Sequence, residues 1–193
     1  MANLVSRFGL TRYDADEYYR IALNHYKKRN LEEAIHSIDQ ALALLPTRAE
    51  YYATRGFFRL EDGVPIKAAE DFEMALRHNP YEMLANYGKG VIAYQDKDWE
   101  GAQQYFLTAW AAMPDRAETL YYLSLVAHRL GENERALDWM QRARDAFDKR
   151  SEKRPVSDAD EWLRELRRLV SRDILFREKQ LDIGTQPDTE ADQ

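Results

Sequence analysis

Residues 49–82 read AEYYATRGFFRLEDGVPIKAAEDFEMALRHNPYE. Two alanines, Ala68 and Ala75, flank Phe72 in this stretch, and Pro80 follows them. Small side chains let two helices approach closely where they cross, and a large apolar side chain fills the space between neighbouring helices. The stretch therefore predicts two helices joined by a short turn, and the proline is expected to end the second helix.

The same pattern recurs every 34 residues in four consecutive segments. The paired alanines are Ala34 and Ala41, Ala68 and Ala75, Ala102 and Ala109, and Ala136 and Ala143. The large apolar residues between them are Ile38, Phe72, Phe106 and Met140. The eighth position is always small, with Ala22, Gly56, Gly90 and Ser124. No residue is inserted or lost, so we assign four repeats: 15–48, 49–82, 83–116 and 117–150.

Each repeat carries signals for a turn and for the end of its second helix. The turn residues are Arg29-Asn30, Gly63-Val64, Lys97-Asp98 and Gly131-Glu132. Glycine and asparagine tolerate the left-handed backbone that such turns often require. Prolines close the first three repeats, at Pro46, Pro80 and Pro114, whereas Asp148 replaces the fourth. The last helix of the repeats is therefore expected to run on, to about Arg150.

This pattern resembles the tetratricopeptide-repeat (TPR) family over residues 15–150. The second repeat carries most of the family's positions, with Tyr52, Gly56, Ala68, Phe72, Ala75 and Pro80. Asn86 and Lys89 depart from the pattern in the third repeat. The resemblance implies an all-α fold, a right-handed α-solenoid of four TPR helix–turn–helix units closed by a C-terminal capping helix.

Both ends of a solenoid expose an apolar face that needs a cover. The N-terminal segment 1–14 is expected to cover the first repeat through Leu4, Val5, Phe8 and Leu10. At the other end, segment 151–181 is predicted to form the capping helix, beginning at Ser157 as the N-cap. Its apolar stripe comprises Leu163, Leu166, Val170 and Ile174, flanked by Trp162 and Leu169. The alternative is that this helix forms a dimer seam or a partner contact. Residues 182–193 are predicted to be a disordered acidic tail.

Composition narrows the classes of function. The 193 residues are 45% hydrophobic and 32% charged, with a formal net charge of -6, which disfavours a nucleic-acid binder. There is no cysteine, no H-E-x-x-H pair of histidines and no apolar run long enough to span a membrane. We therefore predict a cytoplasmic protein that is not an enzyme and takes no cofactor and no metal. Basic and acidic residues interleave between Lys149 and Asp173, which favours a salt-bridged surface over a phosphate-binding one.

The resemblance also implies a binding surface, because the first helices of TPR units line a concave face that holds partner segments. The predicted groove residues are Tyr19, Leu23, Tyr26, Phe57, Leu60, Tyr87, Val91, Tyr94, Tyr121, Leu125 and His128. An acidic rim is predicted at Asp16, Glu50 and Glu118. An apolar, tyrosine-rich strip of this kind is typical of an interaction site, although the same residues could simply pack between repeats.

These features favour an adaptor or assembly factor that binds an apolar or amphipathic protein segment, one with basic flanks. The alternative is a self-assembling homodimer that uses the C-terminal helix. The family's carboxylate clamp, which holds acidic C-terminal tails, is not expected, because no basic residue stands at its positions. Counted from the first repeat these positions hold Tyr19, Leu23, Thr54, Leu84 and Gly88, and from the second Ala53, Phe57, Gly88, Glu118 and Tyr122.

Overall fold

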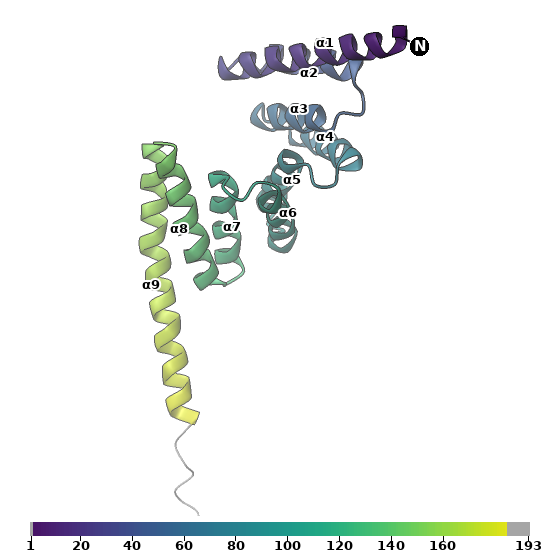
Figure 1. Ribbon diagram of the computed structural model, residues 1–193. Helices are drawn as coiled ribbons and strands as arrows, with labels where there is room; N and C mark the ends of the chain where they lie inside the picture. Colours follow the sequence, from purple (N-terminus) through teal and green to yellow (C-terminus); the bar gives the residue numbers. More distant parts are fainter. Residues whose placement is uncertain (1, 185–193) are drawn as a thin grey trace, which may run out of the picture. The chain divides into compact units, whose positions relative to one another are not determined.

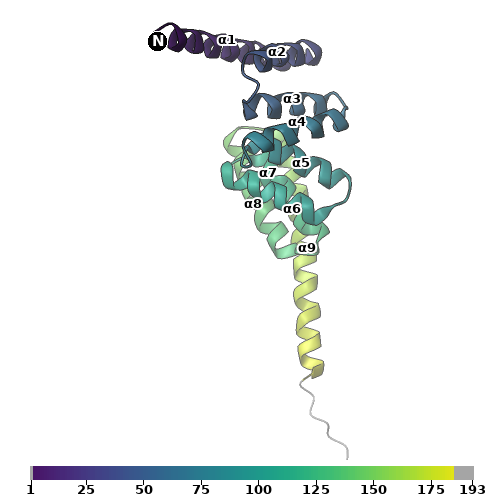
Figure 2. The ribbon, with the colours of Figure 1, turned by 90° about the vertical axis from the view of Figure 1, so that its right-hand side faces the viewer.

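The computed structural model describes the backbone of residues 2–184 and the side chains of 11–176 and 180. This part of the chain is all-α and holds nine helices (Figures 1 and 2). They are α1 (Ala2–Lys27), α2 (Leu31–Leu44), α3 (Ala49–Glu61), α4 (Pro65–His78), α5 (Met83–Gln95), α6 (Trp99–Ala112), α7 (Ala117–Arg129), α8 (Asn133–Lys149) and α9 (Lys153–Gly184). The chain divides into two compact parts, Met1–Asp115 and Arg116–Gln193.

The helices follow the predicted step of 34 residues. The second helices begin at Leu31, Pro65, Trp99 and Asn133, and the first helices end at Lys27, Glu61, Gln95 and Arg129. In the first part α1 packs on α2, α3 on α4 and α5 on α6, while in the second part α8 packs on both α7 and α9. The predicted helix pairs are therefore confirmed.

The prolines end the second helices as expected. Each of Leu45, Asn79 and Met113 precedes a proline and leaves helical geometry, with ψ angles of 77°, 101° and 85°. The fourth repeat has Asp148 at this position, and α8 continues to Lys149, so the predicted extension is confirmed.

The turns within the repeats share one left-handed residue. It is the first residue of each predicted pair, with φ of 64° at Arg29, 76° at Gly63, 64° at Lys97 and 78° at Gly131. The expectation that Asn30 takes this backbone is wrong, since its φ is -93°. In each turn the residue after the left-handed one donates its N–H back to the carbonyl five residues earlier, and this hydrogen bond fixes which residue must be left-handed.

The small residues at the eighth position lie where the paired helices touch. A Cβ added to Gly56 would lie 2.7 Å from the Phe72 ring, and one added to Gly90 would lie 2.8 Å from the Phe106 ring. The Ser124 hydroxyl donates a hydrogen bond of 2.6 Å to a backbone carbonyl of α8. The predicted close approach is therefore confirmed.

The two terminal helices differ from the expectations in where they begin. α9 starts at Lys153, so the N-cap predicted at Ser157 is wrong. Pro155 is the third residue of α9, where a backbone N–H would lack a helical partner in any case, and the helix tolerates it. α1 is helical from Ala2, which includes most of segment 1–14, but the side chains expected to cover the first repeat lie outside the described ones.

α9 packs on α8 over only part of its length. Leu163 and Leu166 are buried and Val170 is half-buried, whereas Ile174 is exposed. Asp173 accepts a hydrogen bond from Asn133, the first residue of α8, at 2.8 Å. Beyond that contact α9 projects past the end of α8 (Figure 1). Residues 182–184 belong to this helix, while the rest of the predicted tail lies outside the described residues.

Candidate functional site

The predicted groove residues lie on the first helices of the repeats, where most of them are half-buried. The half-buried members are Tyr19, Leu23, Tyr26, Phe57, Leu60, Tyr94, Tyr121, Leu125 and His128. Tyr87 and Val91 are only 8% exposed, so the expectation of an open strip is wrong at these two positions. The Tyr87 ring lies edge-on to Phe106, with 5.9 Å between ring centroids, and therefore supports the packing of α5 on α6.

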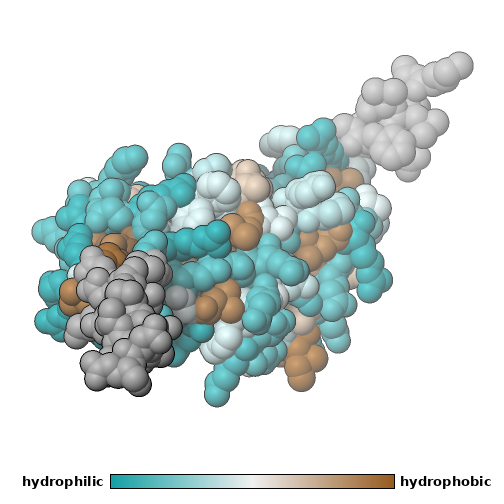
Figure 3. Space-filling view, turned by 90° about the horizontal axis from the view of Figure 1, so that it is seen from below, coloured by the Kyte–Doolittle hydropathy of each residue, from teal (hydrophilic) through white to brown (hydrophobic). Residues whose placement is uncertain are grey.

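Ring contacts bring some of these residues together within each part. In the first part Tyr26 lies 5.8 Å from Phe57, which joins α1 to α3. In the second part His128 of α7 lies 5.7 Å from Trp162 of α9. These contacts hold the rings in fixed orientations and leave part of each ring accessible. On the face shown in Figure 3, hydrophobic residues form separate patches among hydrophilic ones.

The predicted acidic rim is held by the chain's own side chains. Asp16 accepts a hydrogen bond of 2.7 Å from the Tyr51 hydroxyl, and Glu50 lies 3.3 Å from Arg48. Burial and this hydrogen bond both raise the pKa of Tyr51, so the phenol stays protonated and keeps donating to Asp16.

Glu118, the third rim residue, is held most firmly. It forms an ion pair of 2.7 Å with Arg150 and another of 3.3 Å with Arg116. Burial alone raises the pKa of Glu118, but its hydrogen bond with Arg150 outweighs that effect, and the pKa is lowered. The rim carboxylates are therefore already engaged and offer less charge to a partner than their sequence positions suggest.

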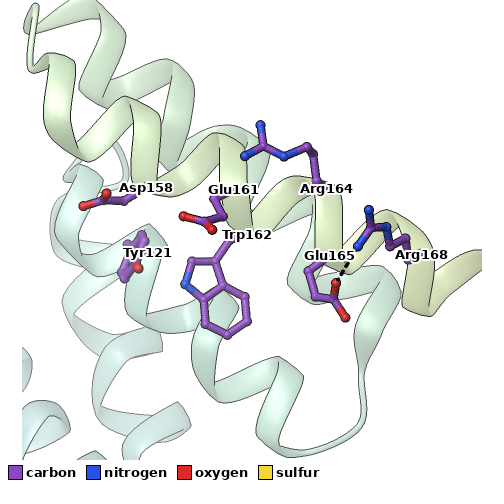
Figure 4. A pocket seen from close by; sticks show the side chains of 7 residues that line it. All are labelled: Tyr121, Asp158, Glu161, Trp162, Arg164, Glu165 and Arg168. Atoms are coloured by element: carbon purple, nitrogen blue, oxygen red, sulfur yellow. Dashed lines mark hydrogen bonds and ion pairs between the residues drawn. The ribbon is translucent and has the colours of Figure 1, made fainter.

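A hollow between α7 and α9 was missed by the sequence reasoning. Its cavity of about 550 Å³ is lined by Tyr121 from α7 and, from α9, by Asp158, Glu161, Trp162, Arg164, Glu165 and Arg168 (Figure 4). Trp162 was assigned only to the flank of the capping stripe, and the α9 acids were assigned to a salt-bridged surface. Because the hollow needs α7 and α9 side by side, the spacing within α9 carried no sign of it.

The described residues offer neither a metal site nor a membrane-spanning helix. None of their groups of histidine, aspartate and glutamate side chains could hold a metal ion. No described helix is both long enough and apolar enough to pass through a bilayer.

Comparison with known proteins agrees with the geometry of the helix pairs. One tetratricopeptide-repeat family model matches residues 15–48, and a second matches 67–117 and 98–151. The chain belongs to the TPR family. Its fold is the all-α solenoid of helix pairs that the repeat predicted. A search of curated protein sequences finds no match to this TPR chain.

Several solved structures share the fold at low sequence identity. PilF of Pseudomonas aeruginosa aligns with a TM-score of 0.62 and 20% identity, covering 80% of this chain and 77% of PilF. MamA of Desulfovibrio magneticus RS-1 aligns with a TM-score of 0.57 and 20% identity, covering 80% of this chain and 96% of MamA. The first TPR of Spaghetti (RPAP3), bound to the HSP90 peptide SRMEEVD, aligns with a TM-score of 0.56 and 16% identity. The alignment covers 62% of this chain and 95% of the RPAP3 chain.

Proposed function

We propose that this TPR protein is an interaction scaffold that binds a segment of another protein on the face formed by the first helices α1 and α3 within residues 1–115. The observation that carries the proposal is the row of half-buried aromatic and apolar side chains on that face, including Tyr26 and Phe57. Their packed sides fix the rings, and their accessible sides offer apolar area at little entropic cost. A bound peptide on the related fold of RPAP3 supports the same use of the fold.

The bound segment is expected to be apolar or amphipathic. No basic residue stands at the clamp positions, so an acidic C-terminal tail like that of the HSP90 peptide would find no cation there. Thr54, one of those positions, is buried and its hydroxyl lies 3.4 Å from that of Tyr19. Aromatic contact therefore supplies the recognition that charge supplies in clamp-type members.

Replacing Phe57 on the proposed binding face with lysine tests this proposal. Phe57→Lys is expected to abolish capture of partner proteins from the source cell's extract, because it places a charge among apolar contacts. The variant should still fold, since a half-buried lysine can extend its ammonium group into water. Tyr81→Lys is the control, because Tyr81 is 74% exposed and outside the first helices. Capture is measured by quantitative co-purification, and folding by circular dichroism.

The result that would overturn the proposal is a folded Phe57→Lys protein that captures the same partners in the same amounts. Tyr87→Ala is a poor choice for this test. The Tyr87 side chain is buried, so its loss would disturb packing as well as binding.

Self-association is a second candidate, favoured by the projecting end of α9. Ile174, Leu175 and Phe176 are 43%, 58% and 62% exposed there, and consecutive exposed apolar residues often mark an interface. Under this candidate the intact chain is a dimer by light scattering, and replacing all three residues with serine makes it a monomer. An intact chain that stays monomeric at high concentration would rule the candidate out.

A further inference from the structure

The hollow between α7 and α9 has an aromatic floor. The Trp162 indole is half-buried and lies 5.7 Å from the His128 ring, at an interplanar angle of 63°. Trp162 and Tyr121 also pack against the buried cluster that contains Leu163 and Leu166. The cavity of about 550 Å³ is large enough for a long side chain, and its rings are held in place by the core beneath them.

The walls of the hollow carry uncompensated negative charge. Within the described side chains of residues 116–176, every aspartate and glutamate has a polar or charged partner except Asp158 and Glu161. Both side chains are exposed, and both carboxylates lie on the side of α9 that holds Trp162. Unlike the predicted rim, these acids are available to a ligand.

The two arginines that line the hollow do not neutralise these acids. Figure 4 marks the hydrogen bonds and ion pairs among the lining residues, and none of them joins Arg164 to Asp158 or Glu161. Arg168 pairs with Glu165 at 3.5 Å instead. A group that enters between Asp158, Glu161 and the Trp162 ring therefore meets two carboxylates and one aromatic face, which is an environment that favours a cation.

We infer that this hollow receives an arginine side chain of a protein partner. The inference rests on the proposed function and names the partner's chemistry at one position. A guanidinium group can stack on the Trp162 ring while donating its fork of N–H groups to Asp158 and Glu161. A lysine would fit the charge but would use the flat aromatic floor less well.

The test uses two peptides, acetyl-Ala-Ala-Arg-Ala-Ala-amide and the same sequence with glutamine in place of arginine. Each is titrated into the isotope-labelled full chain, and the indole N–H resonance of Trp162, assigned with Trp162→Phe, is followed. The arginine peptide is expected to shift this resonance saturably, and the glutamine peptide should bind at least about tenfold more weakly. Replacing both acids, Asp158→Asn with Glu161→Gln, should weaken the arginine peptide about tenfold or more.

The matched control is Asp138→Asn with Asp145→Asn on α8, which changes the net charge equally outside the hollow. It is expected to alter the peptide's affinity less than about twofold, because exposed charges at a distance are screened by salt. Equal weakening by both double variants, equal binding of both peptides, or no saturable shift of Trp162 would each overturn the inference. The proposed function stands or falls separately, on the capture experiment with Phe57→Lys.

Discussion

Replacing Asp71 with alanine is expected to lower the free energy of unfolding by about 3–5 kcal/mol, because it leaves two arginines without their buried partner. The Asp71 side chain is 3% exposed and lies on α4. Arg55 donates to it through Nη2 at 2.6 Å and Nε at 3.0 Å, and Arg59 donates through Nη1 at 2.7 Å. Both arginines belong to α3, so one carboxylate joins the two helices of the second repeat.

The pKa of Arg55 reflects its hydrogen bonds to both aspartates. Burial alone would lower the pKa of Arg55, but its hydrogen bonds to Asp71 and Asp39 outweigh burial, and the pKa is raised. A guanidinium group is charged at neutral pH even without such partners, so Arg55 stays charged when Asp71 is removed and must be accommodated with fewer partners. Urea unfolding followed by circular dichroism measures the loss, and hydrogen exchange of α3 and α4 amides localises it.

Asp39→Ala provides the matched control for the Asp71 cluster. Asp39 also pairs with Arg55, at 2.6 Å, but its side chain is 45% exposed. Its removal is expected to cost no more than about 1 kcal/mol, since exposed ion pairs contribute little and Arg55 keeps Asp71. Equal losses of unfolding free energy for Asp39→Ala and Asp71→Ala would show that the burial of a carboxylate does not determine how much its ion pair with Arg55 stabilises the fold.

Replacing Phe72 with alanine is expected to cost a similar amount, about 3–5 kcal/mol, through the cavity it leaves. The Phe72 side chain is fully buried. The ring packs directly against two glycines, Gly56 of the same repeat and Gly88 of the next. A Cβ added to either glycine would collide with it. Loss of the ring therefore loosens the packing within the second repeat and between the second and third. Hydrogen exchange should show faster opening in α4 and α5 together.

Ile66→Ala is the control for Phe72→Ala on the same helix. Ile66 is 77% exposed, so the change in stability should stay within about 0.5 kcal/mol. Gly88→Ala adds a second check, because its new methyl group would overlap the Phe72 ring and is expected to cost about 1–3 kcal/mol. In the Phe72→Ala background the same change should cost nothing or stabilise the helix. Additive effects of the two substitutions would contradict this packing.

Much of the fold could be predicted because its determinants are local and periodic. A proline acts on the residue before it, as Leu45, Asn79 and Met113 show, and a helix crossing requires a small residue at a fixed place in each repeat. The errors were also local. Asn30 was expected to be left-handed in place of Arg29, and Ser157 was expected to begin α9, because several residues near a helix end fit the same signal.

The proposed binding surface could be predicted only in outline. Residues 19, 57 and 94 lie on the first helices as expected, but burial of Tyr87 and Val91 depends on how closely α5 and α6 pack. The sequence positions of such residues specify which helix they occupy and which way they face. The accessible fraction of each ring is decided by its neighbours across the helix interface.

By itself, the sequence determined the repeat length, the helix pairs, their turns and the family, since these follow from backbone preferences and from small side chains spaced 34 residues apart. Only the tertiary structure decided which charges are free. Glu118 is held by Arg150, 32 residues away, and Asp71 by Arg55, 16 residues away, whereas Asp158 and Glu161 form no ion pair with any side chain that the structure describes. Long side chains reach partners on other helices, so ion pairing depends on three-dimensional distance and has no period along the chain.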